Sequence, residues 1–494
     1  MSHYILSIDQ STQGTKGLLF DENGILIARA DKSHRQIINE FGWVGHDPME
    51  ILQNTLAVCR RVTEKAGIPK SDIKAAAISN QRETSMMWDR ETGKPLDHAI
   101  VWQCARAKEI CERPEFAALS ESFQEKTGLN LSPYFPAPKF TWLMEQIPEA
   151  RILAKKGRLC CGTIDSWLVY CLTNGRSFKT DYSNASRTGL YHIRNLKWDE
   201  ELCSAFQVPP DALPEVCMSD SNFGSTTLGG WLDAPIPIHG ILGDSHGALF
   251  GQDCRLPGQA KVTYGTGSSV MMNLGTEPRI SKKGLVTSLA WGLNGRIEYV
   301  FEGNLNYTGA VITWLRQDLG LIRTDQEATK RAYEANPNDR TYFVPAFTGL
   351  GAPYWDSHAT GMFTGITRTT RRNEIAKACL DCIAYQISDL TDLMSEESGF
   401  PLSTLRADGG PTASSYLMQF QSDIARVKVQ IPDIQELSGM GAAYAAGIAI
   451  GLYNADTIYR HIQRKEYAPE MSPMQQEQLY AGWKHAVRQT LHHL

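Results

Sequence analysis

The stretch YILSIDQSTQGTKGLLFDENGILI, residues 4–27, decides the fold because it arranges short apolar runs around tight turns. Tyr4–Ile8 is rich in β-forming residues, and the polar, glycine-containing cluster 9–15 follows it. Extended character resumes over 16–20, and the turn signal 21–24 precedes a third apolar run. The stretch therefore predicts consecutive hairpin strands. A dinucleotide-binding fold differs, because its first strand leads directly into a helix.

The same pattern returns about half a chain later. Residues 261–272 again combine a strand-like run, a glycine-rich turn and a second strand-like run. We therefore expect two related domains, residues 1–250 and 251–494, with a boundary near Gly251. Strand-like and helical segments alternate through the rest of the chain, which predicts the α/β class. Three segments are predicted to be helices: 48–66, 373–398 and 414–425.

Composition excludes several classes of protein. The 494 residues include 54 acidic and 49 basic side chains, a net charge of −5, so no basic surplus favours nucleic-acid binding. The N-terminus lacks the apolar stretch of a signal peptide, and no run of about 18 apolar residues predicts a membrane span. Eleven cysteines, an odd number scattered over a long chain, favour a reducing compartment. We therefore expect a cytoplasmic protein.

The two turns are candidates for phosphate binding. Asp9 lies between an apolar strand and a turn of small residues, which can direct several backbone N–H groups at one phosphate. Its carboxylate could hold Mg²⁺ through water. The alternative is an ordinary hairpin in which the aspartate caps a turn. The second turn, with Gly265 and Thr266, favours phosphate, since two such hairpins facing a cleft would clamp a triphosphate. The P-loop pattern GxxxxGK[ST] is absent from the sequence.

Asp244 is the candidate general base. It follows the strand-like run 236–242 and precedes an apolar helical pattern, so it could take a proton from an attacking hydroxyl. The alternative is a helix N-cap. His246 is interpreted as a hydrogen-bonded packing residue, because a lone histidine in apolar surroundings usually has that role.

Polar and aromatic residues elsewhere suit a polyol. Arg82 and Glu83 follow a strand-like run, and together they can donate to and accept from neighbouring hydroxyls. The alternative is a surface ion pair that contributes little to stability. Trp102 and Tyr134 could supply flat walls, although large aromatic residues are often core. The double-glycine turn in 405–411 would let a flat ring approach the backbone, or is a plain strand-to-helix turn.

These residues lie in stretches that resemble the FGGY carbohydrate kinases, and within them most closely the glycerol kinases. The resemblance covers residues from about 4 to about 452. The stretches that carry it are SIDQSTQGTKGLLFD (7–21), GWVGHDPMEI (42–51), SNQRETSMMWDRETGKP (79–95), AIVWQCARA (99–107), DYSNASRTGL (181–190), VPAFTGLGAPYWD (344–356) and DGGPTASSYLMQFQSDI (408–424). YFPAPKFTWLMEQ (134–146) fits one family signature. GMFTGITRTTRRNEIAKACLD (361–381) nearly fits the other, with Cys379 out of pattern.

The resemblance implies an actin-like fold, with two RNase H-type domains and an active site in the cleft between them. It implies transfer of the γ-phosphate of MgATP to a terminal hydroxyl by a homodimer or homotetramer. By motif match, Asp244 would be the catalytic base and Asp9 the acid associated with Mg²⁺. The implied substrate residues are Arg82, Glu83, Trp102 and Tyr134, and the implied nucleotide residues are Thr12, Gln13, Lys16, Gly265, Thr266, Gly309, Gly410 and Ser414.

Two departures from the glycerol kinases bear on the substrate. Glycerol kinases typically carry Gln where this chain has Ser245, and Phe where it has Ser269, and both positions line their glycerol pocket. Both changes remove side-chain volume from the pocket. A small ligand would leave that space empty or filled with weakly bound water. We therefore expect a polyol or ketose of four or five carbons. Gln13 and Lys16 replace the usual Thr and Arg, and a lysine still neutralises phosphate, though not bidentately.

Two alternatives remain open from the sequence. The protein could be a true glycerol kinase in which the pocket substitutions are neutral. It could instead be an actin- or chaperone-like ATPase that uses nucleotide as a conformational switch, with Asp9 and both turns but no sugar phosphorylation. ADP release stimulated by a polyol separates these functions.

Overall fold

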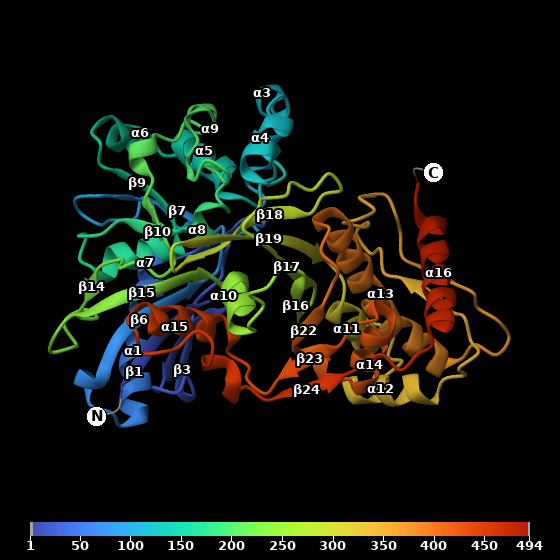
Figure 1. Cartoon of the computed structure of the whole chain (residues 1–494). Helices are drawn as coiled ribbons and strands as arrows, with labels where there is room; N and C mark the ends of the chain where they lie inside the picture. Colours follow the sequence, from blue (N-terminus) through green and yellow to red (C-terminus); the bar gives the residue numbers. More distant parts are fainter. Residues whose placement is uncertain (1–2, 493–494) are drawn as a thin grey trace.

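The structure is a computed structural model that describes residues 3–492, and it has two lobes, each built on a mixed β-sheet (Figure 1). The strands of the first sheet are, in spatial order, β14 (Ser225–Thr226), β15 (Ile236–Gly243), β6 (Ile73–Asn80), β1 (Tyr4–Gln10), β2 (Gly14–Phe20) and β3 (Leu26–Ser33). Those of the second are β18 (Val286–Leu293), β19 (Arg296–Leu305), β17 (Ser268–Gly275), β16 (Gln259–Tyr264), β22 (Thr404–Gly409), β23 (Val429–Pro432) and β24 (Arg464–Tyr467).

The two sheets share one strand order. The run β3-β2-β1-β6-β15 consists of three antiparallel neighbours followed by two parallel strands. The run β19-β17-β16-β22-β23 has the same order and the same directions. The repeat expected from the two hairpin stretches is therefore present, and the predicted α/β fold of two RNase H-type lobes is confirmed.

Local sequence signals account for the predicted helices. Helix α1 (Pro48–Ala66) has the predicted bounds, because Asp47 caps it by accepting from the Met49 N–H and Gly67 ends it in the left-handed conformation. Helices α13 (Arg372–Ser398) and α14 (Ser415–Ala425) begin within one residue of the predicted starts. Ser414 is the N-cap of α14.

Helix α15 (Leu437–Ala449) comes late in the chain but packs in the first lobe, beside β6 and helix α10 (Asp244–Gly251) (Figure 1). Met440 of this helix belongs to the same buried cluster as Ile5 and Leu18 of the first hairpin. The contact with α10 is backbone to backbone, since a Cβ built on Gly441 would overlap the carbonyl oxygen of Gly247. A C-terminal segment thus completes the core of the N-terminal sheet.

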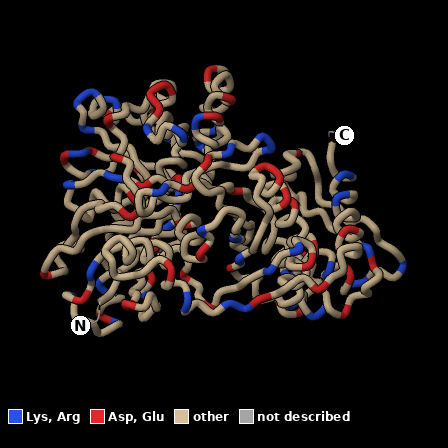
Figure 2. Tube along the Cα trace, in the orientation of Figure 1, with Lys and Arg blue, Asp and Glu red and all other residues tan. Residues whose placement is uncertain are grey.

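The remaining elements surround the two sheets. A five-stranded sheet in the first lobe comprises β4 (Ile37–Ile38), β5 (Val44–His46), β8 (Ala99–Ile100), β7 (Ser85–Asp89) and β9 (Leu159–Thr163). The other helices that matter below are α5 (Pro136–Gln146), α8 (Tyr182–Ala185), α11 (Gly309–Gln317), α12 (Asp325–Glu334) and α16 (Pro473–Thr490). Within the described residues, no helix is both long and apolar enough to cross a membrane. Acidic and basic residues are interspersed over both lobes (Figure 2).

Candidate active site

Parallel strands bring the first group of predicted residues to one sheet edge. Asn80, the last residue of β6, is in register with Gly243 at the end of β15. Asp9 lies near the carboxyl end of β1, which is the neighbour of β6. Arg82 follows β6 by two residues, and Asp244 directly follows β15. The predicted base, substrate arginine and metal-associated acid therefore lie at the same carboxyl edge.

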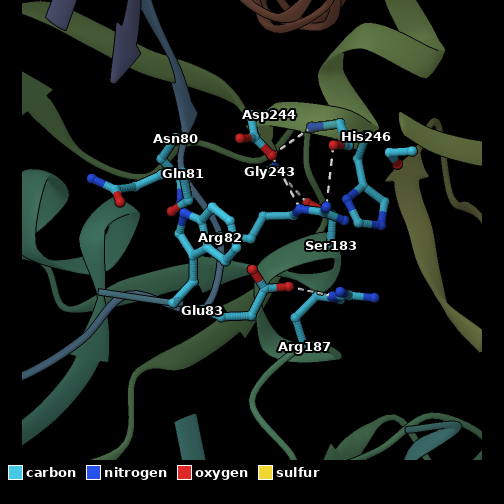
Figure 3. A network of polar contacts seen from close by, with 12 residues as sticks. Asn80, Gln81, Arg82, Glu83, Ser183, Arg187, Gly243, Asp244 and His246 are labelled. Carbon is cyan, nitrogen blue, oxygen red and sulfur yellow. Dashed lines mark hydrogen bonds and ion pairs between the residues drawn. The ribbon is translucent and has the colours of Figure 1, made fainter. Parts of the chain in front are cut away.

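The short helix α8 holds two of these strand ends together. Asn184 and Asn80 exchange a pair of side-chain hydrogen bonds of 2.9 and 3.0 Å. The Ser183 Oγ accepts a hydrogen bond of 2.9 Å from the Gly243 N–H (Figure 3). Because Asp244 follows Gly243 directly, these contacts fix the backbone from which the candidate base projects.

Asp244 has one anchored oxygen and one free oxygen. Gly243 is the N-cap of α10, so Asp244 is the first helical residue rather than the cap. The Asp244 Oδ1 accepts from the Ser245 N–H at 2.6 Å and lies 3.1 Å from the Arg82 Nε. The Oδ2 has no hydrogen-bond partner among residues 3–492, and the side chain is 36% exposed. The free oxygen is therefore available to accept a proton.

Arg82 starts a buried chain of charges that crosses between the lobes. Its Nη1 and Nη2 donate to the two carboxylate oxygens of Glu302, on β19 of the second lobe, at 3.0 and 2.8 Å. Arg187 pairs with the same carboxylate at 2.8 Å. It also donates through Nε to the Glu83 Oε1 at 2.6 Å (Figure 3). Arg82 and Glu83 thus have separate partners, and both are buried rather than on the surface.

Burial makes the pairing of these charges necessary. Burial alone would raise the pKa of Glu302, but Arg187 and Arg82 hold it well below its ordinary value. Burial would lower the pKa of Arg82, but the surrounding carboxylates, Glu302 first, raise it well above its ordinary value. Both groups are therefore charged near neutral pH. Glu83 has a positive φ of 59°, a backbone conformation that is costly for a non-glycine residue and is typical of functional sites.

The predicted aromatic residues lie next to the first turn. The rings of Trp102 and Tyr134 have their centroids 5.5 Å apart, and both side chains are half-buried. The indole Nε1 of Trp102 donates to the Thr12 Oγ1 at 2.9 Å. The predicted substrate wall and the predicted phosphate turn are therefore in direct contact. Gln13, at the tip of that turn, is exposed.

The two serines that depart from the glycerol kinase pattern form hydrogen bonds with the two partners of one ion pair, Arg82 and Glu302. The Ser245 Oγ accepts from the Arg82 Nη2 at 3.1 Å. The Ser269 Oγ, on β17 of the other lobe, donates to the Glu302 Oε1 at 3.1 Å. The two substitutions therefore act on the same part of the site.

Lys16 lies between Asp9 and a second carboxylate, that of Glu436, which no sequence motif indicated. Lys16 donates to the Glu436 Oε2 at 2.7 Å and lies 3.5 Å from the Asp9 Oδ2. Burial raises the pKa of Asp9, Lys16 opposes that rise, and the carboxylates of Glu436 and Asp244 add to it. Lys16, assigned to phosphate by the resemblance, is thus held between two acids beneath the first turn.

The donor set at this edge fits Mg²⁺. The carboxylates of Asp9 and Asp244 are hard oxygen donors, and their mutual repulsion would be relieved by a cation. Across residues 3–492, no three His, Cys, Asp or Glu side chains converge to hold a metal ion. A bound Mg²⁺ usually retains several water ligands and is also coordinated by phosphate oxygens of the substrate. The protein therefore needs to supply only one or two carboxylates.

The second turn lies against the start of helix α11. The Gly309 N–H donates to the Gly265 carbonyl at 3.0 Å, and the Ala310 N–H donates to the Thr266 carbonyl at 2.9 Å. A Cβ on Gly309 would overlap the Gly265 carbonyl oxygen, so only glycine allows this approach. The turn therefore presents backbone with little side chain in the way, which suits a phosphate.

Gly410 and Ser414 line a cavity of about 110 Å³ between α11, α12, α13 and the turn that precedes α14. A Cβ built on Gly410 would meet no atom within 4 Å, so its backbone borders open space. The preceding Gly409 has a φ of 98°, and a Cβ there would overlap the Tyr264 carbonyl. The Ser414 Oγ accepts from the Thr329 Oγ1 at 2.7 Å. The double-glycine turn therefore does more than connect a strand to a helix, since it forms one wall of a cavity.

Comparison with known proteins agrees with this geometry. The N-terminal domain of the FGGY family of carbohydrate kinases matches residues 4–251, and the C-terminal domain of that family matches residues 260–450. The chain belongs to the FGGY family of carbohydrate kinases. The predicted family and the predicted enzyme class, a phosphotransferase acting on an alcohol group, are confirmed. Membership also decides against the alternative of an ATPase switch.

Three relatives of this carbohydrate kinase match along nearly the whole chain. It is 44% identical to a glycerol kinase from Caldanaerobacter subterraneus subsp. tengcongensis and 44% identical to glycerol kinase 1 from Thermotoga maritima. Each match covers 99% of both chains. The crystal structure of Plasmodium falciparum glycerol kinase with ADP has a TM-score of 0.93, at 35% identity, over 100% of this chain and 99% of that one. The two-lobed actin-like architecture is therefore shared.

Sequence reasoning missed four residues of the kinase that hold its predicted site residues in place: Glu302, Arg187, Lys139 and Glu436. Arg187 and Lys139 lie inside the quoted motifs 181–190 and 134–146. Lys139 has apolar neighbours, whereas Arg187 lies between a serine and a threonine and gives no local signal of burial. Glu302 is an acidic residue within an apolar strand, a pattern that indicates a buried partner. His246 is buried and within reach of the Ser288 hydroxyl at 3.1 Å, as expected of a packing residue.

Proposed function

We propose that this carbohydrate kinase transfers the γ-phosphate of ATP to a terminal hydroxyl of a four- or five-carbon polyol or ketose, with Asp244 as the general base. The observation that carries the proposal is the arrangement around Arg82. Its guanidinium contacts the candidate base on one side and Glu302 on the other. A charged fork held this firmly can orient a hydroxylated substrate beside the base.

The chemical step assigns one task to Asp244. Its unpartnered Oδ2 accepts the proton of the substrate hydroxyl, while the substrate oxygen forms a bond to the γ-phosphorus and the bond to the leaving ADP oxygen breaks. Arg82 keeps the other carboxylate oxygen in place. Asp9 would hold Mg²⁺, which supplies neutralisation of phosphate charge when bound. The backbone of Gly265 and Thr266 would border the phosphates from the other lobe, and the cavity beside Gly410 and Ser414 would take the adenine.

Two small side chains support a substrate longer than glycerol. Ser245 and Ser269 contact the Arg82–Glu302 pair from opposite lobes, where glycerol kinases typically carry Gln and Phe. Each serine also offers a hydroxyl with spare hydrogen-bonding capacity. A substrate with an additional hydroxylated carbon would fill the released volume and use that capacity. The glycerol kinases that match at 44% identity favour the second candidate, glycerol itself.

The proposal includes a homodimer or homotetramer in the cytoplasm. All eleven cysteines are free thiols, which fits a reducing compartment. Light scattering coupled to size-exclusion chromatography measures the assembly, and a monomer at micromolar concentration would contradict it.

A coupled assay of ADP release tests the substrate. The panel comprises glycerol, erythritol, xylitol, ribitol, erythrulose, xylulose, ribulose and a blank without polyol, each with MgATP and each repeated with Asp244→Asn. We expect the highest kcat/KM on a four- or five-carbon compound and a loss of about 10²–10⁴-fold in the variant. Glycerol as the clear best substrate would overturn the chain-length proposal, and full activity of Asp244→Asn would overturn the base.

A further inference from the structure

Lys139 is buried where three segments of the candidate substrate pocket meet. It lies on α5 with a fully buried side chain. Its Nζ donates to the backbone carbonyls of Tyr134 at 2.8 Å, Trp102 at 3.2 Å and Glu83 at 3.5 Å. All three residues are predicted to bind substrate, and they come from three separate segments of the chain.

We propose that Lys139 is a positioning residue that holds Glu83, Trp102 and Tyr134 in one arrangement for the substrate. The inference rests on the proposed function of these three side chains. It does not depend on the length of the polyol. The Lys139 side chain is fully buried, so it acts on the pocket through its hydrogen bonds to these three backbone carbonyls.

The chemistry of an ammonium group matches this task. It has three donors and no acceptor, and here it faces three carbonyl oxygens. Pro138 stands four residues after Tyr134, at the position whose N–H would serve that carbonyl in a continuing helix, and proline has no N–H. The lysine therefore supplies a donor that the backbone lacks. A neutral apolar side chain would leave buried carbonyls without partners.

The surroundings make the ammonium sensitive to pH. Burial lowers the pKa of Lys139 to about 7; Glu83, Cys104 and Cys111 favour its charged form, and Arg106 opposes it. The Glu83 carboxylate is engaged by Arg187, and among residues 3–492 no carboxylate forms an ion pair with Lys139. Above pH 7 the neutral amine keeps two donors for three carbonyls, so the pocket should loosen as pH rises.

The test compares Lys139→Met with Thr141→Val, using whichever polyol the wild-type enzyme phosphorylates best. Thr141 is a buried residue of the same helix that donates to the Phe206 carbonyl at 2.8 Å, away from the pocket. We expect Lys139→Met to raise the polyol KM about tenfold or more, with the ATP KM unchanged and kcat changed far less. Thr141→Val should lower Tm and leave both KM values alone.

A folded Lys139→Met enzyme with an unchanged polyol KM, or with equal rises in both KM values, would overturn the proposal. If that variant does not fold, Lys139→Gln and the wild-type pH profile decide. The wild-type polyol KM should rise several-fold from pH 6 to pH 9 against a flat ATP KM, and a flat polyol KM overturns the proposal. Preference for glycerol in the substrate panel would change the polyol used here, but not this expectation.

Discussion

The two sheets have the same strand order but different residues at their carboxyl edges. The edge of the first lobe carries Asp9, Arg82 and Asp244, whereas the edge of the second lobe carries Gly265, Thr266 and Gly410. Small hydroxylated substrates are distinguished by directional contacts to charged and polar side chains. Phosphates and a flat base are accommodated by bare backbone and open space. One duplicated architecture thus provides a charged half and a backbone half of the proposed site.

Glu302 is the exception in this comparison, because a residue of the second lobe completes the charged half. It lies on β19 and pairs with Arg82 and Arg187 of the first lobe. The largest expected effect therefore comes from breaking this link. Glu302→Ala would take from two buried guanidinium groups the carboxylate that they share, which should lower the free energy of unfolding by about 3–5 kcal/mol.

Urea unfolding of Glu302→Ala measures that loss, and Glu145→Ala is its matched control. The Arg113–Glu145 pair has the same two-pronged geometry, at 2.7 and 2.9 Å, but is partly exposed. Its loss should cost only about 0–1 kcal/mol. Equal destabilisation by the two variants would show that the ion pair between the lobes contributes no more to stability than a partly exposed one.

The backbone half should respond to a single methyl group. Gly309→Ala would drive a Cβ into the Gly265 carbonyl and displace the second turn. We expect the ATP KM to rise by about 10–100-fold, while the equilibrium affinity for the polyol, measured by calorimetry without nucleotide, stays the same. A rise in the polyol Kd of the same size would contradict the division of the site into two halves.

The specificity of the charged half can be shifted by adding volume. Ser269→Phe would remove the hydroxyl that donates to Glu302 and fill space at the pocket. We expect kcat/KM for glycerol to improve relative to the best four- or five-carbon substrate by about tenfold, within the range for one pocket contact. The ratio of the two kcat/KM values is the measurement, and an equal loss on every substrate would refute the volume argument.

The last expected effect concerns the acid sensitivity of the first turn. The Gln36 Nε2 donates to the Thr12 carbonyl at 2.7 Å, and its Oε1 lies 2.9 Å from the His46 Nε2. Burial lowers the pKa of His46 to about 3. An unfolded histidine binds a proton near pH 6.5, so stability should be full above that pH and fall as pH decreases toward 3, by up to about 1.4 kcal/mol per unit.

Unfolding in urea at pH 5, 6 and 7 tests this prediction, with His46→Gln as the variant that cannot titrate. The difference in unfolding free energy between pH 7 and pH 5 should be smaller in the variant than in the wild type. An identical pH dependence would show that His46 does not contribute.

Much of the fold could be predicted because its signals are local. The strand-turn-strand stretches and helix α1 depend on alternation, turn residues and caps within a few positions of one another. The placement of α15 could not be predicted this way, since its apolar surface packs against strands more than 350 residues earlier in the chain. The pattern shows that such a helix is buried, but not which sheet it covers.

The candidate site also contains residues that could be predicted from local sequence signals and residues that could not. Asp9, Arg82 and Asp244 follow apolar strands, so their gathering at one edge could be inferred from their positions. Lys16 is assigned to phosphate by motif match, but its ion pair with Glu436 could not be predicted, because the two residues are 420 positions apart. Glu302 and Arg187 could not be predicted as residues of the site. Each can be buried because the other neutralises its charge, and no local sequence pattern pairs them.

The glycine contact between α10 and α15 has a consequence for genetic variation. Asp244 begins α10, and the helix rests on Gly441 through bare backbone. A coding change that adds even one methyl group at position 441 would push against the helix that carries the proposed base, Asp244. Such an allele would keep every residue proposed to contact substrate and every motif intact, yet we expect it to encode a kinase of much reduced activity. A natural variant of this enzyme can therefore have all its motifs and still be inactive, because a methyl group replaces one hydrogen atom at position 441.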